Sequence, residues 1–261
     1  MNILDIRGLK KSYGDDRMIL RGIDLVIPEG QFIGLIGLSG AGKSTFLRCL
    51  NRLVDASSGE ILVPEAVFLE GNSTRTIDIN TLKGKSLRYW RRKTGMIFQQ
   101  FNIVKRLSVI DNVLSGKLGY AGSFGSTLRR FSAEDKELAL INLERVGMLS
   151  HAYKRADALS GGEQQRVAIA RTLMQKPRLI LADEPVASLD PKLSETVLEI
   201  LRRVAREDGI STIVSLHTLE MTRRYSDRII GLAAGEVAFD DTPEHLNEKV
   251  VNEIYQRYQQ S

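Results

Sequence analysis

Residues 32–53 read FIGLIGLSGAGKSTFLRCLNRL, and this stretch decides the fold class of the chain. Its first five residues are apolar apart from one glycine and predict a short buried strand. A glycine-rich turn follows, and apolar side chains then recur at helical spacing from residue 44 to residue 53. A strand, a tight loop and a helix in this order are typical of α/β proteins with a parallel sheet.

The loop between strand and helix carries a phosphate-binding pattern. Residues 37–44, GLSGAGKS, fit G-x-x-x-x-G-K-[ST] in the context that this motif requires. Glycines let the backbone turn and aim N–H groups at phosphate oxygens, and the helix offers its positive N-terminal end. The pattern alone leaves ATP and GTP open. We expect nucleotide contacts from Gly37, Leu38, Ser39, Gly40, Ala41, Gly42, Lys43, Ser44 and Thr45.

Two acidic residues follow a second predicted strand, residues 179–182. We expect Asp183 to hold Mg²⁺ through its water shell, together with the hydroxyl of Ser44, while Lys43 reaches the β- and γ-phosphates. Glu184 is then free to act as the general base that orients and deprotonates the attacking water. These assignments make the chain a candidate nucleotide hydrolase.

A histidine follows the next predicted strand, residues 212–216. Because parallel strands bring their carboxyl ends to one edge of the sheet, we expect His217 to lie beside Glu184. There it would bind the γ-phosphate and hold Glu184 and the water in place. We assign the two other histidines, His151 and His245, to surface or packing positions.

The remaining pattern predicts one core with an inserted lobe. Residues 3–6 and 19–27 read as strands separated by turns and predict an antiparallel sheet. Residues 191–207 predict a helix between two buried strands, residues 109–159 are helix-rich, and residues 243–259 predict closing helices. We therefore expect a single domain, with a core formed by residues 1–98 and 166–261 and a helical lobe of about residues 99–165.

The composition is that of an ordinary globular protein. Of 261 residues, 43% are hydrophobic and 26% are charged, which excludes a disordered or collagen-like chain. Cys49 is the only cysteine, so an internal disulfide is excluded. No apolar run approaches the roughly 20 residues that span a bilayer, and the first residues lack the apolar block of a signal peptide. We expect the chain to remain in the cytoplasm.

The segment Leu159-Ser-Gly-Gly-Glu-Gln164 is the most specific in the chain. At average residue usage this hexapeptide would occur by chance in about one chain in fifty thousand. Ser160 and two glycines precede a predicted helix whose N-terminal dipole suits an anion. The segment matches the signature of the ATP-binding cassette (ABC) proteins, and the chain resembles that family from Tyr13 to about Asp240, with the motifs in the family's order.

The resemblance implies a fold and a dimer. The family's fold is α/β: a P-loop NTPase core with a RecA-like parallel sheet, an N-terminal antiparallel β subdomain and an inserted α-helical lobe. In the family, the signature of one subunit faces the γ-phosphate bound by the other, so the resemblance implies a second ATP-binding subunit. It favours a homodimer and leaves a heterodimer of ATPase subunits open. The residues that it places across the dimer are Ser160, Gly161, Gly162, Glu163 and Asp190.

Other positions match the family with less specificity. Tyr13 resembles the aromatic residue that stacks on adenine, which favours ATP. Gln99 resembles the glutamine that contacts Mg²⁺ and water and links core and lobe, although Gln100 beside it leaves this choice open. Residues 83–93 mix six cations with two aromatic residues, but the family's pattern here favours a solvated helix face. We therefore expect no nucleic-acid partner.

Four stretches resemble the phosphonate import ATP-binding proteins more than other cassettes: residues 84–102, 106–116, 183–190 and 227–232. This implies ATP hydrolysis that drives uptake of phosphonate or a related reduced phosphorus compound such as phosphite. The implied partners are two transmembrane permease subunits and an extracytoplasmic solute-binding protein, with this chain peripheral on the cytoplasmic face of the inner membrane. Residues 64–80 are longer and more polar than the subfamily pattern, which leaves the transported solute open.

Two other functions also stay open. The ATPase subunit of an amino-acid importer would share every catalytic motif. A cassette ATPase that acts on DNA or ribosomes is less favoured, because such proteins usually carry two cassettes or a long coiled coil, and this chain shows neither.

Overall fold

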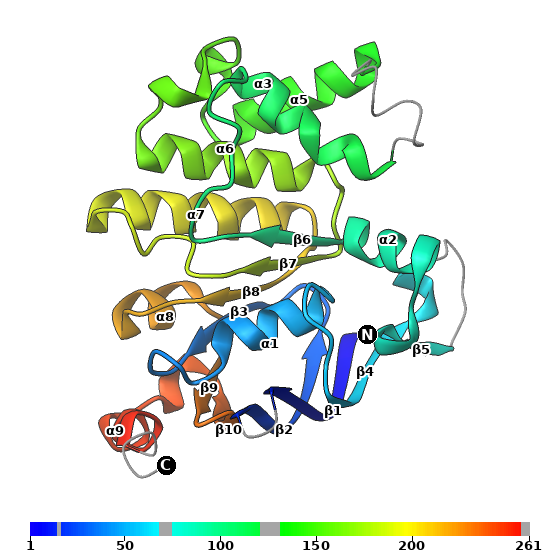
Figure 1. Cartoon of the computed structure of the whole chain (residues 1–261). Helices are drawn as coiled ribbons and strands as arrows, with labels where there is room; N and C mark the ends of the chain where they lie inside the picture. Colours follow the sequence, from blue (N-terminus) through cyan, green and yellow to red (C-terminus); the bar gives the residue numbers. More distant parts are fainter. Residues whose placement is uncertain (15–16, 68–74, 121–130, 257–261) are drawn as a thin grey trace.

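The computed structural model describes residues 1–14, 17–67, 75–120 and 131–256. Within these ranges a large sheet lies between a smaller sheet and a helical lobe (Figure 1). The large sheet contains, in spatial order, β10 (Glu236–Asp241), β9 (Arg228–Ala233), β3 (Phe32–Ile36), β8 (Ser211–Ser215), β7 (Leu179–Ala182) and β6 (Thr94–Ile97). All strands except β10 run parallel, so their carboxyl ends share one edge.

The smaller sheet is antiparallel, as the N-terminal pattern predicted. Its order is β2 (Arg17–Pro28), β1 (Asn2–Tyr13), β4 (Ser58–Pro64) and β5 (Thr76–Asp78). The unusually polar stretch at residues 64–80 lies partly outside the described residues, and β5 is the strand that the structure shows within it.

The two faces of the large sheet pack against different layers because successive side chains of a strand point to opposite faces. Ile33 and Leu35 pack with α1 (Lys43–Leu50) and the antiparallel sheet. Phe32 faces the other way and packs with α6 (Gly161–Leu173) and α7 (Pro191–Glu207). The loop between β3 and α1 is therefore fixed at both ends by buried apolar side chains.

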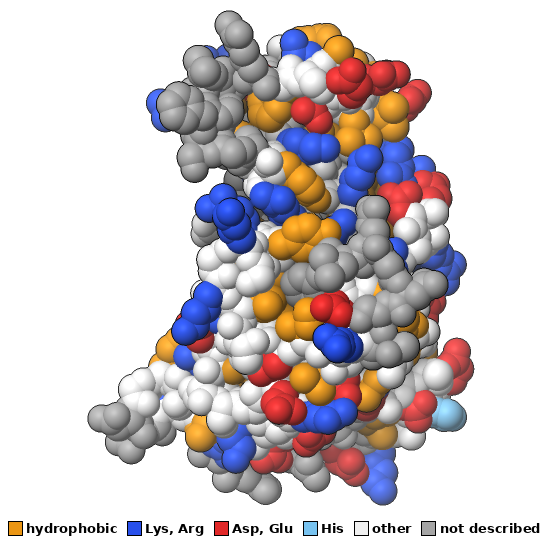
Figure 2. All heavy atoms as spheres, turned by 90° about the vertical axis from the view of Figure 1, so that its right-hand side faces the viewer, with side chains coloured by type: hydrophobic (Ala, Val, Ile, Leu, Met, Phe, Trp, Pro, Cys, Tyr) orange, Lys and Arg blue, Asp and Glu red, His pale blue; other side chains and the backbone are white. Residues whose placement is uncertain are grey.

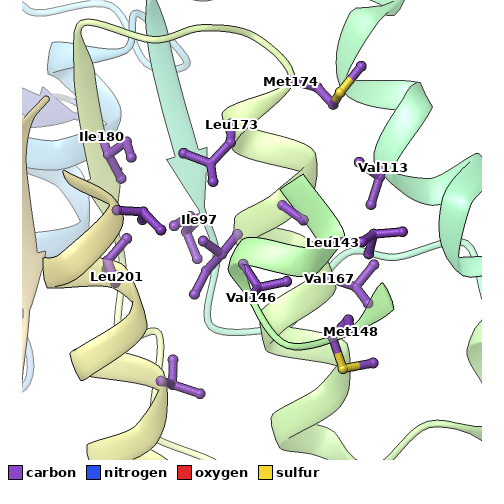
Figure 3. Packing of buried hydrophobic residues seen from close by; sticks show 14 of the residues in the cluster. Ile97, Val113, Leu143, Val146, Met148, Val167, Leu173, Met174, Ile180 and Leu201 are labelled. Atoms are coloured by element: carbon purple, nitrogen blue, oxygen red, sulfur yellow. The ribbon is translucent and has the colours of Figure 1, made fainter. Parts of the chain in front are cut away.

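The helical lobe is α3 (Val109–Leu114), α5 (Ala133–Arg145) and the first turns of α6. Figure 3 shows Val113, Leu143 and Val167 of these helices in one cluster with Ile97 and Ile180 of the sheet. Lobe and core thus share a continuous hydrophobic interior, and the predicted boundary at residues 165 and 166 falls inside α6. The sequence also predicts a Gly/Ser-rich segment within the lobe, residues 116–126, and its part from residue 121 onward lies outside the described residues.

The remaining helices are α2 (Gly84–Lys93), α8 (Leu219–Tyr225) and α9 (Glu248–Gln256). Trp90 anchors α2, since its indole Nε1 donates to the Leu50 carbonyl at 2.9 Å, while Lys85 and Arg88 are exposed. On the face that carries α2, Lys and Arg side chains are interspersed with acidic ones (Figure 2). Among the described residues, no helix is long and apolar enough to cross a membrane.

Candidate functional site

The backbone of the glycine-rich loop has positive φ angles, which residues with a side chain rarely adopt. Gly37, Gly40 and Gly42 have φ angles of 148°, 86° and 102°. A Cβ atom at residue 37 would lie 2.3 Å from the Leu232 carbonyl oxygen of β9. Gly42 is the N-cap of α1 and offers no side-chain cap, so the first-turn N–H groups of α1 stay available for an external acceptor.

The Lys43 side chain folds back over the glycine-rich loop and binds its backbone. Its ammonium Nζ donates to the carbonyl oxygens of Gly37 at 2.7 Å and of Leu38 at 3.2 Å, and the residue is buried. Burial lowers the pKa of Lys43, while the nearby carboxylates of Glu184 and Asp183 act in the opposite direction. The two carbonyl oxygens are neutral acceptors, and a phosphate bound in this loop would offer the Lys43 ammonium an anionic acceptor instead.

Ser44 and Asp183 form a pair of oxygen ligands. The Ser44 hydroxyl donates to Oδ1 of Asp183 at 2.7 Å, and Asp183 is only 5% exposed. Arg48, one turn along α1, pairs with Oδ2 of Asp183 at 3.4 Å. One carboxylate and one hydroxyl fit Mg²⁺, which takes few protein ligands and completes its shell with water and phosphate oxygens. The described residues hold no cluster of three or more His, Cys, Asp or Glu side chains that could bind a metal ion by themselves.

Glu184 and His217 come together at the carboxyl edge of the sheet. Strands β7 and β8 pair in parallel with Ala182 opposite Val214, so the residues that follow each strand are neighbours. The His217 Nε2 atom lies 2.7 Å from Oε1 of Glu184. Glu184 has a left-handed φ of 50°, and its N–H donates to the Ser215 hydroxyl at 2.8 Å. The prediction that these two side chains meet is confirmed.

A cavity of about 480 Å³, within the usual range for small-ligand sites, is lined by six of the nine predicted loop residues together with Tyr13 and Glu184. The other three loop residues, Gly37, Leu38 and Ala41, do not line it. Tyr13 stands 46% exposed at its rim. Three lining residues were not predicted from the sequence, Arg17, Ile19 and Arg48, although Arg48 is four residues after Ser44 and therefore shares its helix face. The lining residues are Tyr13, Arg17, Ile19, Ser39, Gly40, Gly42, Lys43, Ser44, Thr45, Arg48 and Glu184.

Gln99 lies apart from this cavity. It follows β6 and is exposed, and it lines a second hollow of about 400 Å³ together with Gln100, Phe101, Gln164 and Ser188, among others. The structure therefore places both glutamines beside the start of the signature helix. It does not bring Gln99 to the pair formed by Ser44 and Asp183.

The signature residues do not line the cavity either. Ser160 is the N-cap of α6, and Oε2 of Glu163 accepts from the Ser160 hydroxyl at 2.7 Å and from the Ser160 N–H at 2.8 Å. These hydrogen bonds lower the pKa of Glu163, the hydroxyl contributing most. Gly161 and Gly162 pack against Leu189 and Leu193, and Asp190 caps α7 by accepting from the Leu193 N–H at 3.0 Å. None of these residues lines the cavity in its own chain.

Comparisons with known proteins agree with this architecture. A family model described as "ABC transporter" matches residues 20–187. The chain is 49% identical to the "Phosphonates import ATP-binding protein PhnC 2" of Halalkalibacterium halodurans, over 97% of this chain and 100% of the relative. It is 47% identical to the "Phosphonates import ATP-binding protein PhnC" of Wolinella succinogenes, over 97% of this chain and 88% of that protein.

Solved structures show the same fold. The dimeric post-hydrolysis state of the ATP-binding cassette MJ0796, bound to ADP and Pi, superposes with a TM-score of 0.76 at 32% identity, covering 92% of this chain and 99% of that chain. A second cassette, cbiO1 from Clostridium perfringens, gives 0.78 at 27% identity, with coverage of 96% and 92%. The predicted fold class is confirmed, and the chain belongs to the ATP-binding proteins of the ABC transporter family.

Proposed function

We propose that this chain is the ATPase subunit of an importer for phosphonate or a related reduced phosphorus compound such as phosphite. The main observation in favour of ATP hydrolysis is the contact between His217 and Glu184. Glu184 lines the same cavity as Lys43 and Ser44 of the glycine-rich loop. The choice of solute is supported by the similarity to phosphonate import ATP-binding proteins along nearly the whole chain. Tyr13 at the rim supports adenine as the base.

Lys43, Ser44 and Glu184 of the cavity act in the proposed hydrolysis together with two residues that contact its lining, Asp183 and His217. The loop N–H groups and the Lys43 ammonium bind and orient the β- and γ-phosphates. Ser44 and Asp183 would hold Mg²⁺, which neutralises phosphate charge when it is bound. Glu184 accepts a proton from the attacking water, whose oxygen bonds to the γ-phosphorus as the bond to the β–γ bridging oxygen breaks, and ADP and phosphate leave. His217 keeps the Glu184 carboxylate in place for this transfer.

A second copy of the chain completes the site in this proposal. Ser160, Gly161, Gly162 and Glu163 lie outside the cavity of their own subunit, yet they open a helix whose N-terminal dipole favours an anion. In a head-to-tail pair, these residues would close over the γ-phosphate bound by the partner. Asp190, at the start of α7, would then lie near the contact between the subunits.

The membrane partners follow from the same family relationship. We infer two transmembrane permease subunits, an extracytoplasmic solute-binding protein, and a peripheral position for this chain on the cytoplasmic face of the inner membrane. The hollow beside Gln99 lies where core and helical lobe meet, so a permease segment that docks there would respond to rotation of the lobe. Nucleic acid has no part in this proposal.

Growth of the host organism tests the proposal. The gene is deleted, and growth is compared on phosphonate, phosphite or phosphate as the sole phosphorus source, after restoring the parental chain or Glu184→Gln. Loss of growth on phosphonate or phosphite alone, rescued only by the parental chain, is the expected result. Unimpaired growth on all three sources would contradict uptake of a phosphorus compound and leave the amino-acid importer as the leading candidate.

A further inference from the structure

Arg171 on α6 makes an uncommon pair of hydrogen bonds. Its guanidinium Nη1 donates to the Asn102 carbonyl at 2.5 Å and its Nη2 donates to the Phe101 carbonyl at 3.1 Å. Burial lowers the pKa of Arg171, and no described carboxylate pairs with it to offset that cost. A guanidinium that gives up water for two carbonyl oxygens, without an ion pair, holds those carbonyls in one place.

The two carbonyls belong to the segment that follows Gln99. Asn102 has a left-handed φ of 50°, a conformation that asparagine adopts more readily than most residues with a side chain. The same segment also lies against the N-terminal end of α6. A Cβ atom built on Gly161 would lie 3.5 Å from the Phe101 ring. Arg171 lies ten positions after Gly161, roughly 15 Å along the axis of α6. The segment that follows Gln99 thus contacts α6 near both ends of that helix.

We propose that Arg171 is the positioning residue that couples the Gln99 segment to the signature helix. A shift of Gln99, whether towards bound nucleotide or under a docked permease, then moves α6 and with it Ser160 as one body. This inference rests on the proposed function, since it assigns the connection between the permease side and the signature of that same ATPase. Arg171 touches neither the nucleotide cavity nor Ser160 itself.

The same helix supplies a matched control. Arg166 also donates to two backbone carbonyls, those of Val146 and Gly147, both at 3.4 Å. These carbonyls lie at the end of α5 and have no contact with the Gln99 segment through Arg166. Replacing either arginine removes a guanidinium that bridges α6 to backbone, but only Arg171 holds residues 101 and 102.

The first experiment uses hydrogen–deuterium exchange on the full chain, with the parental protein, Arg171→Lys, Arg171→Met and Arg166→Met. Exchange is compared with and without Mg²⁺ and a non-hydrolysable ATP analogue. In the parental chain and Arg166→Met, we expect the analogue to slow exchange in residues 99–103 and in residues 160–165 together. In both Arg171 variants, the analogue should bind within twofold of the parental affinity, while the two segments no longer respond together and the protection of residues 160–165 is lost. Protection of both segments in Arg171→Met would overturn the inference.

The second experiment uses the complete transporter. Arg171→Lys and Arg171→Met should lower the stimulation of ATPase turnover by solute-loaded binding protein about tenfold, with KM for ATP unchanged, and Arg166→Met should leave it unchanged. Equal loss in Arg166→Met and Arg171→Met would show that α6 is merely destabilised and would overturn the inference. Failure of the proposed function is distinguishable, because the parental complex would then show no stimulation by phosphonate or phosphite while the exchange pattern persists.

Discussion

The Nε2 atom of His217 lies 2.7 Å from Oε1 of Glu184, and the N–H of Glu184 donates to the hydroxyl of Ser215, two residues before His217. Residues from the ends of two neighbouring parallel strands therefore fix both the backbone and the carboxylate of Glu184. Such a carboxylate is oriented before any substrate binds. Preorganisation of this kind is what a general base needs in order to act on a water molecule.

Glu184→Gln tests the role of this carboxylate. The amide has nearly the same shape as the carboxylate but cannot accept the proton, so we expect kcat for ATP hydrolysis to fall by at least about 10²-fold. Nucleotide affinity should change little, because the phosphate contacts come from the loop and Lys43. Steady-state ATPase rates and fluorescent-nucleotide binding measure the two effects. A parental rate in this variant would exclude Glu184 as the base.

His217→Ala addresses the second partner of the same contact. We expect kcat to fall about tenfold or more while KM for ATP stays within a fewfold, since His217 positions Glu184 and does not line the nucleotide cavity. The double variant His217→Ala with Glu184→Gln should be no slower than Glu184→Gln alone, because both changes disable one step. Additive losses in the double variant would show that the two residues act independently.

Gly37→Ala tests the backbone of the glycine loop. A Cβ atom there would lie 2.3 Å from the Leu232 carbonyl oxygen, so the loop must move away from β9. We expect a loss of about 2–4 kcal/mol in the free energy of unfolding, measured with urea, and weaker ADP binding. Gly209→Ala is the control: φ is +63° but nothing lies within 4 Å of the new Cβ, so the loss should stay near 1 kcal/mol with ADP affinity unchanged.

Cys49 gives a pH-dependent prediction. Burial in α1 raises the pKa of this thiol to about 11 from an ordinary value of 9.0. The unfolded chain therefore loses the thiol proton first as the pH rises, and the stability present below pH 9 falls by about 3 kcal/mol towards pH 11. Urea unfolding at a series of pH values should show this additional fall in the parental chain relative to Cys49→Ala. Equal slopes in the two chains, or rapid labelling of Cys49 by a thiol reagent in the native protein at pH 8, would contradict a buried thiol.

Much of the core could be predicted from local pattern. The bounds of β3, β7 and α7 agree with the apolar runs and the proline and aspartate signals around them. The helix after the glycine loop, predicted to reach residue 53, ends instead at Leu50, because Asn51 caps it and Arg52 adopts a left-handed φ of 56°. Helical spacing of apolar residues does not reveal such a stop, since Leu53 continues the pattern beyond it.

The parts that local pattern missed depend on contacts between distant segments. Arg17 lines the cavity because the β1–β2 hairpin sets it opposite Tyr13, and Arg48 because α1 carries it beside Asp183. The link from Arg171 to residues 101 and 102 joins segments about 70 positions apart. No spacing rule along the chain predicts that pair. By contrast, the meeting of Glu184 and His217 could be predicted, because parallel strands place their ends at one edge whatever the length of chain between them.

Reconstituted uptake tests the central claim most directly. Proteoliposomes are prepared with the permease subunits and this chain, with ATP inside and solute-binding protein outside, and uptake of methylphosphonate, phosphite and glutamine is measured. We expect ATP-dependent uptake of methylphosphonate or phosphite with the parental chain, no uptake of glutamine, and no uptake of any solute with Glu184→Gln. Uptake of glutamine in place of the phosphorus compounds, or undiminished uptake with Glu184→Gln, would contradict the central claim.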